Sequence, residues 1–573
     1  MKKFLIGILT GLVLAVLTGL VFVFSAIRLS ERRPTVPDGA TLILNLDGDI
    51  PEKQPVHIPI PFIGSTDTFT ILDAWHGLRS AANDGRIKAV VLETGRIGAG
   101  WGKIQELRDG LLAFKKSGKP LVAVIRTPRS REYYLATAAD RIYMSPEDLF
   151  DVKGLRAEVM FLKNALSKIG VAVEIEHRGK YKDAGDMFSE TALSPESREV
   201  IDSILDGVYS NMLTTYSESR KKSVAEMRGL IDQGPYTARQ AAGKGLVDAL
   251  RYEDQVYGEL RDRLKQGELK KFSFHDYVSA TGGKDRAAKK RIAFVVGEGA
   301  ITRGEGTDAM GTDEGFTSGA FIKMLRRVSS DNSISGVIMR VDSPGGDAVA
   351  SDEMLREVRL LSKKKPTIIS FSDTAASGGY YISMTGDPIV SYPNTVTGSV
   401  GVVYGKVNLR SLYDKIGVHK EILVRGNNAA IDSDYTPLTP EARAKLREGI
   451  DEIYNEFVSR VAEGRKKKWE EIEPLAQGRA WLGSQAKQNG LIDELGGLDK
   501  ALELLKKKAG LRADERIELV PYPPKRSILD QYLKSTSSDQ TIETKLRKIL
   551  GFDYEVWLRG GMMKMMPYTV SLQ

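Results

Sequence analysis

Short apolar runs alternate with amphipathic stretches along most of this 573-residue chain. In its second half, the runs Arg291–Val296 and Gly336–Val341 predict strands that are buried on both faces of a sheet, and Thr367–Ser372 predicts another strand. Between them, Leu325–Val328 and Met354–Leu361 space their apolar residues as one face of a helix does. Buried strands that alternate with amphipathic helices are typical of βαβ units, so the pattern predicts an α/β fold with a mostly parallel sheet.

The same pattern occurs twice along the chain. The buried runs Ala89–Leu92 and Gly336–Met339 begin 247 residues apart, and the motifs Gly245–Asp248 and Gly490–Asp493 begin 245 residues apart. Spacing held within two residues over such a distance indicates tandem copies of one fold. The prediction divides the chain into an anchor at 1–33, a first copy at 40–265, a linker at 266–288, a second copy at 289–512 and a tail at 513–573.

The N-terminus carries a long uncharged run. Lys2 and Lys3 precede Phe4–Ile27, which contains no charged residue. About 20 apolar residues cross a bilayer, whereas the core of a cleaved signal peptide has only about 7–15. The run therefore predicts an uncleaved transmembrane anchor, with the small residues Ser25 and Ala26 leaving a cleaved signal as the alternative. No second run of this length follows, so we expect the rest of the chain on one side of the membrane.

Composition excludes several kinds of chemistry. The chain has no cysteine, which excludes disulfides, zinc–thiolate sites and cysteine nucleophiles. Its net charge of +8 is spread over helices of mixed sign and is not clustered among aromatic residues. We therefore expect no nucleic-acid partner. No metal site and no cofactor is predicted.

A glycine-rich turn in the second copy suits a nucleophile. The predicted strand ends near Ser372, and Ser377 follows in a turn of small residues just before Gly378. Glycine lets a substrate carbonyl approach the backbone, and the N–H of Gly378 can bind the oxyanion that forms when a serine attacks. A second glycine turn, Asp342–Gly346, could supply another donor. An ordinary tight turn is the alternative interpretation.

A serine nucleophile needs a base, and the candidates are few. None of the five histidines lies in either glycine turn, so a Ser-His-Asp triad would require a distant histidine to approach. In the first copy, Lys180 and Lys182 follow a predicted strand, whereas the matching stretch of the second copy, Gly426–Ala430, has no lysine. The alternative is that both lysines are solvated surface residues.

The first copy has also lost the glycine turn. It keeps Ser130, but Arg131 and Glu132 replace the two glycines that follow Ser377. A bulky charged pair should block the approach of a carbonyl. The first copy has therefore kept a base and lost the nucleophile site, and the second copy shows the reverse. Such complementary loss predicts a single composite site between the two copies.

Four motifs make the chain resemble the signal peptide peptidase A family in its long, double-repeat bacterial form. These motifs are Asp342–Gly346, Ala375–Tyr380, Thr397–Gly401 and Gly179–Lys182. The resemblance implies two ClpP/crotonase-like βαβ superhelix repeats behind one transmembrane helix. It also implies that Ser377 is the nucleophile and Lys182 the general base. Ser399 would orient the lysine, and Gly346 and Gly378 would form the oxyanion hole.

The resemblance further implies a bowl-shaped homotetramer in the bacterial cytoplasmic membrane. Its catalytic part would lie on the periplasmic side and hydrolyse cleaved signal peptides. Two alternatives stay open: a catalytically inactive membrane scaffold of the same fold, and a crotonase-like acyl-CoA enzyme.

A lysine can act as a base only if the fold lowers its pKa. A free lysine has a pKa of about 10.4, so action near neutral pH requires a drop of about three units. Burial in an apolar groove without a carboxylate partner produces such a drop. We therefore expect the neighbouring Asp183 to point away from the amine of Lys182. We also expect substrates to be extended apolar peptides.

Overall fold

The computed structural model describes residues 34–53, 69–282, 288–304, 316–523 and 561–566, together with Gly7 and Gly11. The predicted anchor lies outside these ranges except for those two glycines. Among the described residues, no helix combines the length and the apolar composition that crossing a bilayer requires.

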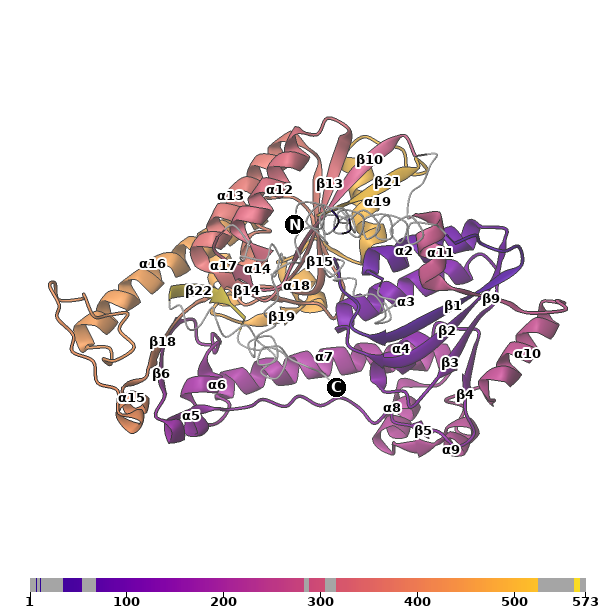
Figure 1. Ribbon diagram of the computed structural model, residues 1–573, viewed down its shortest axis with the longest axis horizontal. Helices are drawn as coiled ribbons and strands as arrows, with labels where there is room; N and C mark the ends of the chain where they lie inside the picture. The colour runs from indigo at the N-terminus through magenta and orange to yellow at the C-terminus, as the bar shows by residue number, and fades with distance from the viewer. Residues whose placement is uncertain are drawn as a thin grey trace.

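The first copy is built on a six-stranded parallel sheet in the order β8-β4-β3-β2-β1-β9 (Figure 1). Side chains alternate between its faces: Val90 and Leu92 pack on one side, and Ala89 and Val91 on the other. Helices cover both faces, which explains why the strands are apolar throughout. The strands are β1 (Ala40–Gly48), β2 (Ile87–Ile97), β3 (Leu121–Ile125), β4 (Arg141–Met144), β8 (Ala249–Leu250) and β9 (Lys270–Ser273). The helices are α2 (Ile71–Asn83), α3 (Trp101–Lys115), α4 (Ser130–Ala136), α7 (Pro195–Arg220), α8 (Val224–Asp232), α9 (Ala238–Gly243), α10 (Glu253–Arg263) and α11 (Phe274–Thr281).

The second copy repeats this sheet, with the path β19-β17-β15-β13-β10-β21 and with β16 and β20 beside β15. Met339 packs on one face and Ile338 on the other. The first copy helps to cover the second face, because Leu72 and Trp75 of α2 join that cluster. The strands are β10 (Lys290–Glu298), β13 (Ile334–Ser343), β15 (Thr367–Ala376), β16 (Ile389–Ser391), β17 (Val396–Gly398), β19 (Ala480–Leu482), β20 (Glu494–Leu495) and β21 (Ile517–Tyr522). The helices are α12 (Ser318–Ser330), α13 (Ala348–Lys364), α14 (Gly378–Tyr381), α16 (Pro440–Arg465), α17 (Trp469–Ile472), α18 (Gly483–Asn489) and α19 (Leu498–Lys508), with a short 3₁₀ turn at Glu473–Leu475.

A third, six-stranded sheet joins the copies in the order β12-β11-β14-β22-β18-β6. Strand β6 comes from the first copy, β18 from the second, and β22 from near the C-terminus. β6 and β18 pair antiparallel from Ala172↔Asn408 to Arg178↔Val402. The strands are β6 (Ala172–Arg178), β11 (Ile301–Thr302), β12 (Phe316–Thr317), β14 (Gly345–Asp347), β18 (Val402–Asn408) and β22 (Gly561–Met565). The short elements α5 (Lys163–Ile169), α6 (Asp186–Ser189) and α15 (Arg410–Ile416) flank it, and β5 (Leu149–Phe150) pairs separately with β7 (Tyr236–Thr237).

The α/β fold and its strands agree with the prediction. All three strands expected in the second half lie within β10, β13 and β15, and both expected helices lie within α12 and α13. The longest helices, α7 and α16, begin in the same way: Ser194 and Thr439 cap them, with proline as the first helical residue.

The limits predicted for the linker and the tail were wrong. The interval 266–288 contains β9 and α11, which belong to the first sheet and its core, and β21 lies within the predicted tail. β9 and β21 begin 247 residues apart, so each is the last strand of its own copy. Both are edge strands of mixed polarity, so they do not show the continuous apolar run that identifies a central strand.

A buried ion cluster also couples the copies. Arg340 of β13 is fully buried, and its guanidinium donates to Glu52 over 2.9 and 3.0 Å. Glu106 of α3 lies 3.4 Å away on the other side, and burial raises its pKa to about 7. Both carboxylates precede the second copy in the chain, so this arginine holds the two halves together.

Candidate active site

Ser377 stands at the sharp turn where β15 ends and α14 begins. Its backbone has φ +53° and ψ −113°, a region that residues other than glycine rarely adopt. The Ser377 N–H donates to Gly398 O over 2.7 Å, and the side chain is fully buried. A strained strand–turn–helix corner of this kind holds a nucleophilic hydroxyl clear of the sheet.

The structure brings Lys182 to this corner within one chain. Lys182 Nζ lies 2.9 Å from Ser377 Oγ, 3.0 Å from Ser399 O and 3.1 Å from Ser399 Oγ. All three residues are fully buried. A neutral amine has two N–H donors and one lone pair. The two acceptors on Ser399 can take the donors, which leaves the lone pair for the Ser377 hydroxyl.

The second copy provides the channel through which the lysine reaches the serine. Lys182 follows β6, and its N–H donates to Gly179 O over 3.0 Å. A Cβ on Gly478 would lie 2.5 Å from Lys182 Cβ, and one on Gly401 would lie 2.9 Å from Lys182 Cδ. Both positions must therefore be glycine for the lysine stem to pass. Lys180, by contrast, is exposed and stacks over the ring of Tyr181.

Burial sets the protonation of the lysine. Desolvation lowers the pKa of Lys182 to about 7, and the negative charge of Asp183 raises it by a smaller amount. This drop is close to the roughly three units that a lysine must lose to act as a base near neutral pH. The lowered pKa makes the neutral form of this amine far more accessible near pH 7 than it is for a free lysine.

Two backbone N–H groups face the same corner. Gly345 and Gly346 have φ of +101° and +154°. A Cβ on Gly345 would lie 2.6 Å from Gly378 N and 3.0 Å from Ser377 Cβ, and a Cβ on Gly378 would lie 3.1 Å from Gly346 N. The backbone N–H groups of Gly346 and Gly378 thus lie close to each other and to Ser377, and Gly346 pairs with Lys564 of β22 in the third sheet.

The first copy holds no equivalent arrangement. Ser130 Oγ donates to Gly154 O over 3.1 Å. The buried carboxylate of Glu132 accepts from the N–H groups of Ile97 and Arg129 over 2.9 and 3.0 Å. In the first copy, the Glu132 side chain therefore takes the place of the second of the two glycines that follow Ser377.

Some residues of the site carried no sequence signal. Gln477 has φ +52°, and its carbonyl accepts from Tyr181 N–H over 2.8 Å, which fixes the loop that carries the lysine. A single Gln-Gly pair is too common to be singled out. Gly478 is needed because a side chain at this position would collide with Lys182. This requirement can be recognised only in the folded structure.

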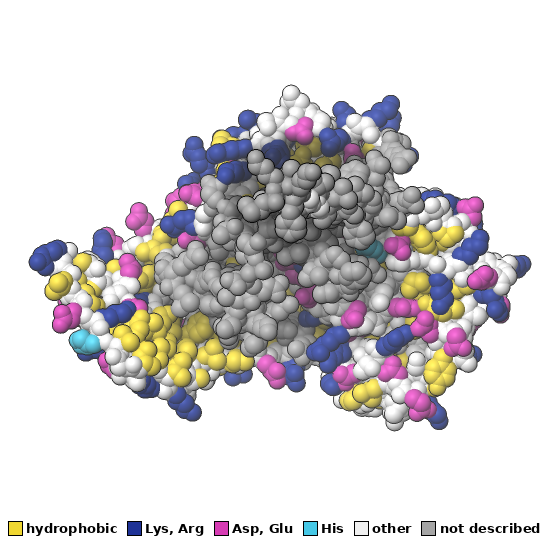
Figure 2. Space-filling model, viewed as in Figure 1, with side chains coloured by type: hydrophobic (Ala, Val, Ile, Leu, Met, Phe, Trp, Pro, Cys, Tyr) yellow, Lys and Arg dark blue, Asp and Glu magenta, His cyan; other side chains and the backbone are white. Residues whose placement is uncertain are grey.

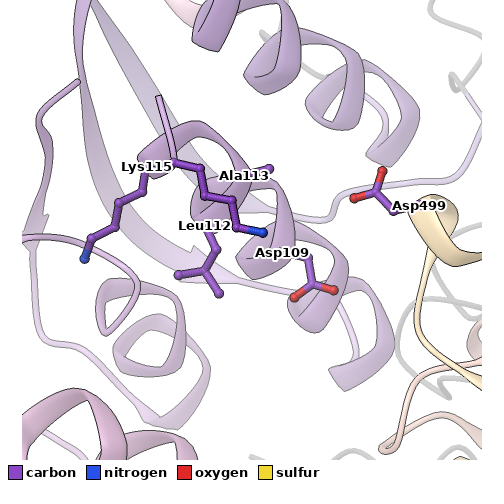
Figure 3. Close-up of a pocket in the computed structure, with 6 residues that line it drawn as sticks. Asp109, Leu112, Ala113, Lys115 and Asp499 are labelled. Carbon is purple, nitrogen blue, oxygen red and sulfur yellow. The ribbon is translucent and has the colours of Figure 1, made fainter. Parts of the chain in front are cut away.

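A surface pocket lies apart from this site. It measures about 530 Å³ and is lined by residues of α3 together with Lys116 and Asp499, the first-turn acid of α19 (Figure 3). Its lining includes neither Ser377 nor Lys182.

Comparison with known proteins gives the family. Residues 113–267 and 359–512 match Peptidase family S49, once in each copy. The chain is 36% identical over 451 residues to the chloroplastic serine protease SPPA of Arabidopsis thaliana, which covers 77% of this chain and 66% of that protein. It is 31% identical over 512 residues to Protease 4 of Haemophilus influenzae, which covers 83% of this chain and 80% of that protein. A solved structure of a ClpP1 mutant from Listeria monocytogenes aligns with a TM-score of 0.24 and 16% identity, over 36% of this chain and 94% of its own. The chain therefore belongs to peptidase family S49 and is a serine peptidase of the double-repeat signal peptide peptidase A type.

Proposed function

We propose that this peptidase is a membrane-bound endopeptidase that uses Ser377 and Lys182 to hydrolyse extended apolar peptides, including signal peptides left after secretion. The observation that carries the proposal is the 2.9 Å contact between Ser377 Oγ and the buried amine of Lys182. An apolar substrate keeps water out of the groove and so preserves the low pKa of that amine.

The proposed reaction follows from the positions of the atoms. The neutral amine of Lys182 takes the proton of Ser377 as Oγ attacks the peptide carbonyl carbon. The N–H groups of Gly346 and Gly378 bind the oxyanion, and Ser399 holds the new ammonium through its carbonyl and hydroxyl. The ammonium then gives its proton to the leaving amine. The freed lysine activates water, which hydrolyses the acyl-enzyme and restores the serine.

The proposed location rests on the uncharged run Phe4–Ile27. A single-pass anchor would hold the catalytic part at the periplasmic face of the bacterial cytoplasmic membrane. That position would bring the groove close to signal peptides after their cleavage.

We also propose that the chain assembles with copies of itself into a tetramer. Within the chain, β6 of the first copy pairs with β18 of the second. The 247-residue repeat places the equivalents of β6 and β18 at 419–425 and 155–161, and neither stretch forms a strand. The stretch 419–425 is mostly exposed, with Leu423 at 92%, and 155–161 alternates half-buried with exposed residues, among them Met160 at 66%. Pairing of 419–425 with 155–161 of the next copy would continue the internal pattern head to tail and close a ring.

Further apolar residues are exposed near the elements that flank the third sheet. β6, β18, α5, α6 and α15 project together as an arm (Figure 1), and hydrophobic side chains gather around α6 in the space-filling view (Figure 2). Exposed apolar patches of this kind mark interaction surfaces. Leu423→Asp should shift the oligomer toward monomer in light scattering, whereas Leu360→Asp, an exposed leucine on α13, should leave the mass unchanged. An oligomer that survives Leu423→Asp would contradict this interface.

The catalytic proposal is tested by three variants with a signal-peptide substrate and a serine-reactive probe. Ser377→Ala should abolish both hydrolysis and labelling, and Lys182→Ala should abolish hydrolysis. Lys180→Ala should retain both, because that lysine is exposed. Equal loss in Lys180→Ala and Lys182→Ala would refute the dyad. A folded wild type with neither activity would favour the inactive scaffold or a crotonase-like acyl-CoA enzyme, because neither needs a serine nucleophile.

A further inference from the structure

Lys103 reaches from the first copy to the strands that carry the proposed active site. It is the third residue of α3, and its side chain is only 9% exposed. Its amine lies 2.8 Å from Asp342 Oδ2, 3.4 Å from Glu298 Oε1 and 3.8 Å from Asp373 Oδ2. These three carboxylates belong to β13, β10 and β15, which are neighbours in the second sheet. A single cation of the first copy therefore contacts three strands of the second.

The cluster lies where the pairing of β13 with β15 is interrupted. Pairing stops at Val341↔Phe371 and resumes at Ser343↔Ala375, so three residues of β15 stand opposite one residue of β13. Asp373 is the middle one of those three. A bulge of this kind leaves the ladder locally unpaired and re-aims the residues beyond it. The residues beyond this bulge are the glycine turn after β13 and the turn of the proposed nucleophile after β15.

Side chains of the cluster supply hydrogen bonds that the interrupted ladder lacks. Asp342 Oδ1 accepts from Thr374 N–H over 3.0 Å. Asp373 accepts from the N–H groups of Gly100 and Lys103 at the start of α3 over 2.8 and 2.7 Å. Two largely buried carboxylates that lie close together repel each other, so a cation between them favours this arrangement. Without the charge of Lys103, we expect the two strand ends to move apart.

Lys103 carries its charge near neutral pH. Burial lowers the pKa of its amine, but the surrounding carboxylates outweigh burial and raise this pKa well above its usual value. Lys182 has the opposite environment, because the effect of burial prevails there and lowers the pKa to about 7. The first copy thus inserts two lysines into the second: one that can lose its proton, and one that stays charged.

The cation and the acids are divided between the copies as the proposed dyad is. The 247-residue repeat places Gly95 and Arg126 of the first copy at the positions of Asp342 and Asp373. It places Ala350 of the second copy at the position of Lys103. The copy with the nucleophile turn therefore has these acids, and the copy with the base has the cation. The cluster accompanies the composite site rather than the fold that both copies share.

We propose that Lys103 is a positioning residue of this peptidase, whose charge holds the glycine turn and the nucleophile turn at the spacing that the transition state requires. The proposal rests on the proposed function, because it takes Ser377 and the N–H groups of Gly346 and Gly378 to be the reacting and stabilising groups. Lys103 acts on them through Asp342 and Asp373. Its loss should therefore slow the chemical step and leave substrate binding nearly unchanged.

Lys103→Met tests this directly, since methionine has a similar length and no charge. In hydrolysis of an apolar peptide, kcat should fall at least about tenfold and KM should stay within about twofold. A peptide aldehyde forms a tetrahedral adduct with a nucleophilic serine, so its affinity should fall by the same factor as kcat. A role in joining the copies alone would lower stability in urea without this separation of kcat from KM.

Two further variants guard against a loss of folding. Asp342→Asn removes the closest partner of the lysine but keeps an oxygen for Thr374 N–H, and it should lower kcat about threefold or more with KM unchanged. Added to Lys103→Met, the same substitution removes one unbalanced charge and should restore kcat at least about threefold. Arg79→Met is the matched control. It removes another cation that joins the copies, through Asp499 of α19, and should leave kcat unchanged.

A wild-type kcat in Lys103→Met or in Asp342→Asn would overturn the proposal, and so would a double variant no faster than Lys103→Met. A failure of the proposed function has a different signature, because hydrolysis would then persist in Ser377→Ala. The positioning role alone fails when Ser377→Ala is inactive and Lys103→Met is as active as the wild type.

Discussion

Replacing the buried amine by an apolar side chain of similar length should change how stability depends on pH. In the wild type, the pKa of Lys182 is about 7, against about 10.5 in the unfolded chain. The unfolded state therefore binds more protons than the folded state between these values, and wild-type stability rises with pH across that window. Lys182→Met removes this contribution.

The magnitude follows from the two pKa values. One unit of pKa shift corresponds to about 1.4 kcal/mol, so the cost of burying the amine is close to 5 kcal/mol at pH 6 and about 2 kcal/mol at pH 9. Relative to Lys182→Met, the wild type should gain about 2–3 kcal/mol between these two pH values. The hydrogen bonds lost at Ser377 and Ser399 affect both pH values alike, so they cancel in this difference.

Urea unfolding of both proteins at pH 6 and pH 9 measures this difference. Lys180→Met is the matched control, and its difference from wild type should not change with pH because the Lys180 side chain is exposed. A constant difference between wild type and Lys182→Met would mean that the amine titrates alike in the folded and unfolded states. That result would refute the buried neutral base.

Three further predictions concern neighbouring groups. Ser399→Ala should lower kcat about tenfold or more and leave KM within about twofold, because it loosens the lysine without touching substrate; an unchanged kcat would remove its positioning role. Gly345→Ala should lower kcat for peptide hydrolysis at least about 100-fold, because the added Cβ would displace Gly378 and Ser377. Normal turnover in this variant would show that the corner has room for a side chain at residue 345. Arg340→Met should cost about 3–5 kcal/mol in urea unfolding because it leaves two buried carboxylates unpaired, whereas the exposed Arg326→Met should cost under about 0.5 kcal/mol.

Sequence reasoning could reach the site because the two copies could be compared. Arg131 and Glu132 in place of glycines, and the lysine missing near Gly426, point to one shared site. Which atoms meet could not be derived in this way. The hydrogen bonds of Lys182 to both Ser377 and Ser399 depend on the crossing of β6 over the second copy.

Fold prediction worked where burial imposes a pattern and failed where it does not. Central strands such as β13 are buried on both faces and carry mostly apolar residues, so their sequence identifies them. β9 is a short edge strand that begins Lys270-Lys271, and its composition resembles a linker. β22 is a strand only because β14 and β18 provide partners, and nothing local to Met562–Met566 indicates that pairing.

The central claim, a neutral lysine that activates Ser377, is tested most directly by the rate at which a fluorophosphonate probe labels Ser377 as pH changes. With a lysine pKa of about 7, the rate should rise about 30-fold between pH 5.5 and pH 8.5 and level off above. A rate that is the same at both values, or that keeps rising tenfold per unit beyond pH 9 as for an ordinary lysine, would contradict the account.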